Sequence, residues 1–335
     1  MHQLEVEEIN LPKSLEPDEL LAETVYSVVS PGTELAAWNG LPLRSGSLYP
    51  RLLGYCNLAR VTAVGDEVEE IGVGDFVLTH QSHRSSFVVS RGDVLLFFKS
   101  LSQEKLKLLS ATYLYHLGYC ALLAGGYFPG NRVAVIGMGT LGFNLVELLQ
   151  TFGCEPCLFS DQLPGPNLNA TFAEGSKVIS KRIALDEGKI QDYFDGPLGS
   201  QMGLDGFDLI VNTSNLWRDH LLALKLARTG GTIVCLGFPG RGQSDLKFNP
   251  LEAEYFYDKQ LTIKHCGHVP SGDVAAIDNR FNLKRNLAYL ASLILSGQLN
   301  PSAIYSIESD WRELESVYRQ LSNREPGQYS AILSW

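Results

Sequence analysis

The pattern of apolar and polar positions divides the chain into a strand-rich front and a mixed remainder. In the first third, short apolar runs alternate with turn residues, a pattern typical of strands with one buried face. It predicts strands over residues 24–30, 59–64, 75–79 and 86–89. The glycine-bearing stretches 64–68 and 71–75 predict a further strand, turn and strand.

Beyond residue 103 the pattern becomes helical, and strands then alternate with helices. Leu106, Leu109 and Leu114 recur among polar positions at helical spacing. The run 132–136 is apolar after Arg132, as in a strand buried on both faces of a parallel sheet. Further strands are predicted over 157–160, 208–211, 232–236 and 331–333, and helices over 143–152, 221–227, 283–295 and 313–321. This alternation predicts an α/β fold with a doubly wound parallel sheet.

Composition is that of an ordinary globular protein and argues against several kinds of partner. A length of 335 residues favours two domains. The 27 basic and 37 acidic residues give a net charge of −10 without a basic stripe, which argues against nucleic acid and anionic membranes as partners. No apolar run reaches the roughly 20 residues of a membrane span. The start of the chain lacks the basic-then-apolar order of a secretory signal, so we expect a cytoplasmic protein.

The six cysteines are scattered and mostly lie among apolar residues, which predicts reduced core thiols. Cys154 and Cys157 have the spacing of a redox pair. They fall between a predicted helix and a predicted strand, however, and no second pair completes a zinc site, so we expect no function for them.

The stretch Gly137-Met138-Gly139-Thr140-Leu141-Gly142 carries the pattern G-x-G-x-x-G between a predicted strand and a predicted helix. Gly137 allows a sharp turn, Gly139 lets backbone N–H groups approach a pyrophosphate, and Gly142 lets the helix pack on the strand. Asp161 ends the next strand, where a carboxylate either binds the ribose hydroxyls of NAD or only caps a turn. We predict NAD, in preference to NADP, on this turn.

The order of motifs resembles one superfamily of dehydrogenases. The front carries Ser30-Pro31-Gly32-Thr33-Glu34, Gly54-Tyr55-Cys56, Val64-Gly65 and Gly74-Asp75. With the nucleotide-binding middle and a short tail, this resembles the medium-chain dehydrogenase/reductase superfamily, and locally the bacteriochlorophyllide-type dehydrogenases. The resemblance implies a β-rich, GroES-like (chaperonin-10-like) catalytic domain from residues 1–113 and 268–335. Residues 114–267 would then form the Rossmann domain.

The resemblance fails where zinc-dependent members bind their metal. They place Cys-Gly-x-Asp where this chain has residues 31–34, and Gly-His-Glu where it has Gly54-Tyr55-Cys56. Their third ligand would fall near Thr112 or Tyr113. Proline cannot bind zinc, tyrosine is a rare ligand, and the four cysteines of the structural zinc are absent. We therefore expect no zinc and no metal-ligating residue.

Without a metal, a hydrogen-bond donor must stabilise charge on the reacting oxygen. Tyr55 stands in place of the zinc-binding histidine, as either that donor or an aromatic wall of the pocket. His80 and His83 should point to opposite faces, so at most one reaches the substrate, and we choose His83 as the second catalytic candidate. Glu34 either orients a neighbouring donor or caps a turn, and we expect the cap. For His116 we expect packing.

The resemblance adds cofactor contacts and an overall function. Leu236 and Cys266 correspond to two loops that hold the carboxamide, and His268 stands beside the expected nicotinamide. We expect a homodimeric, zinc-independent NAD(H)-linked oxidoreductase acting on a carbonyl/alcohol pair of a small or medium organic substrate. Two alternatives stay open. One is reduction of an activated C=C bond, as in enoyl and quinone reductases, which usually prefer NADPH. The other is a non-catalytic nucleotide-binding homologue.

Overall fold

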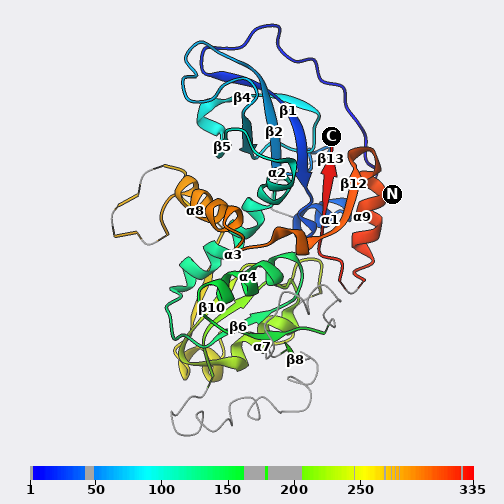
Figure 1. Ribbon diagram of the computed structural model, residues 1–335. Helices are drawn as coiled ribbons and strands as arrows, with labels where there is room; N and C mark the ends of the chain where they lie inside the picture. Colours follow the sequence, from blue (N-terminus) through cyan, green and yellow to red (C-terminus); the bar gives the residue numbers. More distant parts are fainter. Residues whose placement is uncertain are drawn as a thin grey trace. The chain divides into compact units, whose positions relative to one another are not determined.

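The computed structural model describes residues 3–41, 49–161, 178–179, 206–244, 246–267, 269–272, 274–275, 277–278, 280–325 and 327–335. The chain divides into two compact units. One joins Met1–Leu114 to Asn282–Trp335, and the other is Tyr115–Phe281. Each unit is built around a sheet of its own (Figure 1).

Both ends of the chain contribute to the sheet of the first unit. The described strands run in the order β12-β13-β1-β2-β3-β5, with β4 paired to β1. Their bounds are β1 (Glu19–Val28), β2 (Asn57–Val64), β3 (Phe76–Thr79), β4 (Ser86–Ser90), β5 (Leu96–Phe98), β12 (Tyr305–Asp310) and β13 (Ser330–Ser334). Buried residues alternate along the first half of β1, as on a sheet with one face in the core. Leu20 and Ala22 pack there with Val61, Val77 and Phe87.

The C-terminal segment completes this unit. Strand β13 pairs antiparallel with β1, so that Ile332 lies opposite Val28, and Figure 1 shows the red strand beside the blue one. Helix α9 (Leu314–Ser322) lies against α1 (Pro31–Trp38). Tyr318 of α9 is fully buried in the core cluster at this contact. The end of the chain is therefore packed directly on the segment that follows β1.

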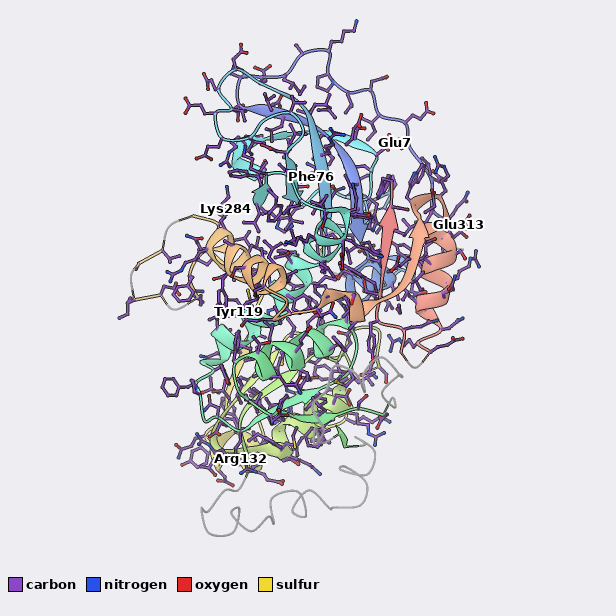
Figure 2. All side chains as sticks on the ribbon, in the orientation of Figure 1. Glu7, Phe76, Tyr119, Arg132, Lys284 and Glu313 are labelled. Atoms are coloured by element: carbon purple, nitrogen blue, oxygen red, sulfur yellow. The ribbon has the colours of Figure 1, made fainter. Side chains whose placement is uncertain are left out.

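Three more helices and three short 3-10 helices belong wholly or partly to this unit. They are α2 (Gln103–Leu109), the start of α3 (Thr112–Gly125), α8 (Leu283–Leu295), η1 (Arg91–Asp93), η4 (Pro301–Ile304) and η5 (Trp311–Glu313). The Ser102 hydroxyl accepts a hydrogen bond from the Lys105 N–H, which explains why α2 begins there. Lys284, near the start of α8, donates to the Gly92 carbonyl at 3.0 Å (Figure 2).

The second unit is an open parallel sheet with the order β11-β10-β9-β6-β7-β8. Its strands are β6 (Val133–Ile136), β7 (Cys157–Phe159), β8 (Val178–Ile179), β9 (Phe207–Asn212), β10 (Ala227–Cys235) and β11 (Thr262–His265). Its helices include most of α3, α4 (Thr140–Thr151), α7 (Trp217–Leu226) and the π-helical turn η3 (Ala253–Tyr257). Every residue of β6 is buried. The order reverses between β6 and β9, as in doubly wound dinucleotide-binding sheets.

The predicted fold class is confirmed, with corrections in the front of the chain. The strand predicted over 24–30 begins earlier, at Glu19, and helix α1 follows it without having been predicted. A proline at the first helical position favours this start, because its fixed φ suits a helix. The strands predicted over 64–68 and 71–75 were wrong, since β2 ends at Val64 and turns and bends connect it to β3. No helix in the described part of the chain is long and apolar enough to cross a membrane.

Candidate cofactor and catalytic site

The glycine turn connects β6 to α4 through a close backbone contact. Gly137 has a φ of +93°, a left-handed conformation that glycine adopts without strain. At Gly142 a Cβ atom would lie 2.0 Å from the carbonyl oxygen of Gly137. Because any side chain would collide with the backbone there, glycine at position 142 is what allows α4 to start so close to the turn.

Gly139 precedes α4 and faces open space. A Cβ atom there would meet no other atom within 4 Å, and Thr140 is the first residue of the helix. The first amides of a helix point away from its body and, together with the helix dipole, attract an anion. The turn therefore fits a cofactor pyrophosphate, which the backbone of Gly139, Thr140 and Leu141 would bind.

The other predicted cofactor residues that the structure describes lie at the same edge of the sheet. Gly137 follows β6, and Asp161 lies two residues beyond β7 with an exposed side chain. Leu236 directly follows β10, and Cys266 directly follows β11. Ligands of open α/β sheets bind outside these carboxyl ends of the strands. His268 lies outside the described residues.

Two thiols of the second unit are unreactive. Burial raises the pKa of Cys235 to about 11 and that of Cys266 to about 12. Since the thiolate is the reactive form, both remain protonated and inert at neutral pH. His116 is 3% exposed, and its Nε2 lies 3.2 Å from the Cys120 sulfur. All six cysteines are free, as predicted, and His116 is packed inside the unit.

In the first unit, Tyr55 lies in the loop before β2. Its hydroxyl donates to Ser30 Oγ, and its ring meets that of Tyr113 edge-on with centroids 5.6 Å apart. Burial raises the pKa of Tyr55 far above its usual range, and the neighbouring Cys56 and Glu34 raise it further. The phenol therefore keeps its proton at physiological pH and remains a hydrogen-bond donor.

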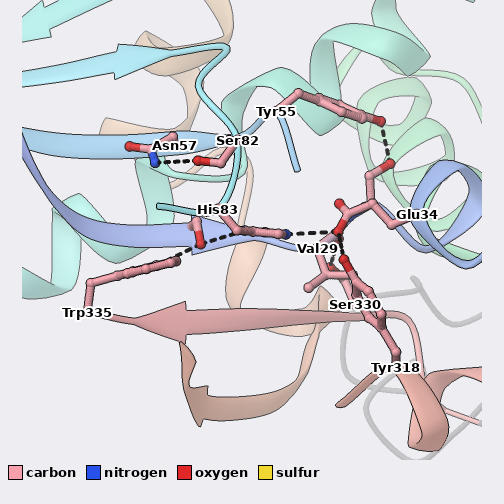
Figure 3. Close-up of polar contacts among 11 residues, drawn as sticks. Val29, Glu34, Tyr55, Asn57, Ser82, His83, Tyr318, Ser330 and Trp335 are labelled. Carbon is pink, nitrogen blue, oxygen red and sulfur yellow. Dashed lines mark hydrogen bonds and ion pairs between the residues drawn. The ribbon is translucent and has the colours of Figure 1, made fainter. Parts of the chain in front are cut away.

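His83, in the loop between β3 and β4, is held on both sides of its ring. Nδ1 lies 2.8 Å from Ser27 Oγ, and Nε2 lies 2.8 Å from Glu34 Oε2. The side chain is only 5% exposed. Figure 3 shows the ring directed at Glu34. His80 is exposed instead, with its ring centroid 4.3 Å from that of Tyr113, so the two histidines occupy very different surroundings.

Glu34 lies at the centre of this network, which the sequence did not predict. Its Oε1 accepts a hydrogen bond from the Ser30 N–H at 2.6 Å, which is the predicted capping role. Its Oε2 also faces His83 and accepts from the Tyr318 hydroxyl at 2.5 Å (Figure 3). Trp335 Nε1 donates to the Ser27 hydroxyl at 2.8 Å. Tyr318 and the terminal tryptophan come from the far end of the chain, so no local pattern could link them to Glu34.

Known proteins resemble this chain in structure. No family model and no curated protein matches its sequence. Galactitol-1-phosphate dehydrogenase from Escherichia coli has a TM-score of 0.78, covering 100% of this chain and 97% of its own at 15% identity. A Sinorhizobium meliloti protein, described as a zinc-binding dehydrogenase and bound to NADP, has a TM-score of 0.73 and is 18% identical. The match covers 98% of this chain and 94% of that protein. An Escherichia coli alcohol dehydrogenase complexed with NADH has a TM-score of 0.73 and is 15% identical. The match covers 100% of this chain and 96% of that protein.

The chain has the medium-chain dehydrogenase/reductase fold. The family resemblance in the sequence aligns the zinc-ligand positions of zinc-dependent members with Pro31, Tyr55 and one of Thr112 or Tyr113. Proline offers no donor atom, and the Tyr55 hydroxyl keeps its proton and bonds to Ser30. These side chains do not make the set of nitrogen, sulfur and carboxylate ligands that zinc requires.

Cys56, next to Tyr55, is a buried thiol. It is 1% exposed, and burial, together with the nearby Glu34, raises the pKa of its thiol well above the usual value. Among the described residues, no three His, Cys, Asp or Glu side chains are grouped so that they could hold a metal ion.

Proposed function

We propose that this protein is a zinc-independent, NAD(H)-dependent oxidoreductase that transfers hydride to or from the carbonyl/alcohol group of a small or medium organic substrate. The observation that carries the proposal is the glycine turn. Gly142 is pressed against the Gly137 carbonyl, while Gly139 faces open space at the start of α4. On a chain with a dehydrogenase fold, a pyrophosphate site of this kind supports binding of a nicotinamide cofactor, which supplies or accepts the hydride.

Tyr55 is the group that we propose to stabilise the reacting oxygen. Its neutral phenol would stabilise negative charge on the reacting oxygen by a hydrogen bond, as a zinc ion does by acting as a Lewis acid in zinc-dependent dehydrogenases. Because Ser30 Oγ is a hydroxyl, it can exchange donor and acceptor roles with Tyr55 and release the phenol proton toward the substrate. His83 already has partners on both ring nitrogens, so we assign it a supporting role beside Tyr55.

The preference for NAD rests on Asp161. Similar structures hold NADP in one case and NADH in another, so the fold itself allows either cofactor. The Asp161 carboxylate is exposed after β7, and we expect it to accept hydrogen bonds from ribose hydroxyls. It would repel the 2′-phosphate that distinguishes NADP.

Calorimetric titration with NADH, followed by turnover assays on aldehydes, ketones, secondary alcohols and enones, tests the proposal. NADH binding with turnover of a carbonyl or an alcohol supports it. Turnover of enones alone would assign the protein to the C=C reductases, and binding without any turnover would make it a non-catalytic homologue. Failure to bind either nicotinamide cofactor would refute it.

We also propose a homodimer, for which light scattering should give twice the chain mass of 36.9 kDa.

A further inference from the structure

The hydrogen bonds around Glu34 have a defined direction. A backbone N–H can only donate, so Ser30 donates to Oε1 at 2.6 Å. An ionised carboxylate can only accept, so Tyr318 and His83 must both donate to Oε2. The proton that His83 shares with Glu34 therefore lies on Nε2 of the ring.

The hydrogen bonds on the Nδ1 side of the His83 ring can also be assigned a direction. The indole nitrogen of Trp335 can only donate, and it donates to Ser27 Oγ at 2.8 Å. The Ser27 hydroxyl hydrogen is then available to His83 Nδ1, also at 2.8 Å. With Nδ1 accepting and Nε2 donating, each of these groups finds a partner. In this arrangement the imidazole carries its shared proton on Nε2.

Glu34 is also connected to Tyr55. The same Ser30 whose N–H binds Glu34 Oε1 accepts the Tyr55 hydroxyl at its side chain. Glu34 and Ser30 are both buried, at 1% and 5% exposure, so water offers little competition for these contacts. Both side chains singled out from the sequence as catalytic candidates therefore depend on one carboxylate, His83 directly and Tyr55 through Ser30.

We infer that Glu34 is a positioning residue for the two catalytic candidates of the first unit, Tyr55 and His83. It holds His83 in the Nε2–H tautomer and, through the backbone N–H of Ser30, holds in place the residue that is the Tyr55 hydroxyl's partner. The Tyr318 hydroxyl anchors the carboxylate from the C-terminal segment, and the Trp335–Ser27 pair anchors the far side of the imidazole. The kinetic consequence rests on the proposed function, whereas the assignment of the tautomer does not.

The test is Glu34→Gln, read out by nitrogen-15 NMR of histidine-labelled protein and by kinetics. The glutamine amide can donate as well as accept, so it no longer dictates where the His83 proton lies. We expect wild-type His83 to be a single Nε2–H tautomer and the variant to contain the Nδ1–H form. Turnover should fall about 10- to 100-fold, since small displacements of catalytic groups cost rates of this order, while NADH affinity stays within twofold. Glu34→Asp, which keeps the charge, should restore the wild-type tautomer.

Glu315→Gln is the matched control, because Glu315 is a partly exposed glutamate of α9 that forms an ion pair with Arg319. It should change neither the His83 spectrum nor turnover. A folded Glu34→Gln protein with the wild-type tautomer and wild-type turnover would overturn the inference. If that variant does not fold, Tyr318→Phe replaces it. It should keep the Nε2–H form and lower turnover severalfold, and unchanged turnover would count against the inference. Absence of NADH binding in the wild type would refute the proposed function but leave the tautomer result standing.

Discussion

At the scale of single residues, turnover should depend most on Tyr55. A positioned proton donor contributes about 10²–10⁴-fold to rate, so Tyr55→Phe should lower turnover by this order. NADH affinity should stay unchanged, because the phenol hydroxyl contacts Ser30 of the first unit rather than the glycine turn. Steady-state kinetics and calorimetry measure the two effects. Tyr289→Phe, at an exposed position of α8, is the control. Near-normal turnover of Tyr55→Phe would mean that another group is the donor.

Asp161 should decide between the two nicotinamide cofactors. Its exposed carboxylate favours ribose hydroxyls and disfavours a 2′-phosphate, so NADH should bind at least several-fold more tightly than NADPH. Asp161→Ala should erode that preference mainly by weakening NADH. Calorimetric dissociation constants for both cofactors, on both proteins, measure the change. Equal or tighter NADPH binding by the unmodified protein would contradict the assignment.

At the scale of an element, the turn between β6 and α4 offers two glycines with opposite expected effects. Gly142→Ala places a methyl group 2.0 Å from the Gly137 carbonyl oxygen. Overpacking typically costs about 1–3 kcal/mol, and a backbone contact this short should reach the upper end. Gly139→Ala meets nothing within 4 Å and keeps a φ of −81°, so stability should not change. Its methyl group should instead obstruct the pyrophosphate and weaken NADH binding.

Thermal unfolding and NADH titration of the same two proteins check this contrast. A Gly139→Ala protein that binds NADH as tightly as the wild type would show that the pyrophosphate does not lie on this turn. An equally stable Gly142→Ala protein would show that the helix moves to accommodate the methyl group.

The turn before β3 should make stability depend on pH. Asp75 accepts hydrogen bonds from Lys99 Nζ at 2.6 Å and from the Gly72 N–H at 2.7 Å. Burial alone would raise the pKa of Asp75, but these partners outweigh it and hold the pKa below its usual value. The carboxylate thus stabilises the fold above its unfolded pKa of about 4, and this contribution is lost as pH falls through the folded pKa. Asp75→Asn should cost about 1 kcal/mol at pH 7.

Denaturant unfolding at pH 7 and pH 3 measures this dependence, because the difference between the two proteins should shrink at the lower pH. Asp66→Asn, at an exposed aspartate nearby, should show little difference at either pH. A cost of Asp75→Asn that is the same at both pH values would mean that the carboxylate charge is not its cause.

Elements with a clear apolar pattern or a glycine motif could be predicted from the sequence. Short helices and turns that carry apolar residues could not. The apolar run of β6 and the glycine pattern after it identified strand, turn and helix together, because each has a separate physical requirement at its own position. Helix α1 was missed because it has only eight residues and follows a strand-like run. Residues 65–75 carry apolar side chains beside glycines and resembled strands, although they form turns and bends.

At the scale of the whole molecule, the candidate site depends on contacts that no sequence window contains. Glu34 meets Tyr318 across 284 residues, and Ser27 meets Trp335 across 308. The antiparallel pairing of β1 with β13 and the contact between α1 and α9 bring these segments together. Tyr55 and His83 could be selected from the sequence because a family resemblance marked their positions. The carboxylate between them was treated as a turn cap, since its other partners belong to the last elements of the chain.

The metal content is the property of the whole protein that most directly tests the proposed chemistry. The sequence resemblance aligns Pro31 and Tyr55 with ligand positions of the zinc-dependent dehydrogenases, and neither residue is a usual zinc ligand. We therefore expect purified protein to carry well under one zinc ion per chain, and prolonged chelation to leave turnover unchanged. Elemental analysis before and after chelation measures both quantities, and a known zinc-dependent alcohol dehydrogenase is the control that must lose activity. About one tightly bound zinc ion per chain, lost together with turnover, would show that ligands other than these residues form a catalytic metal site.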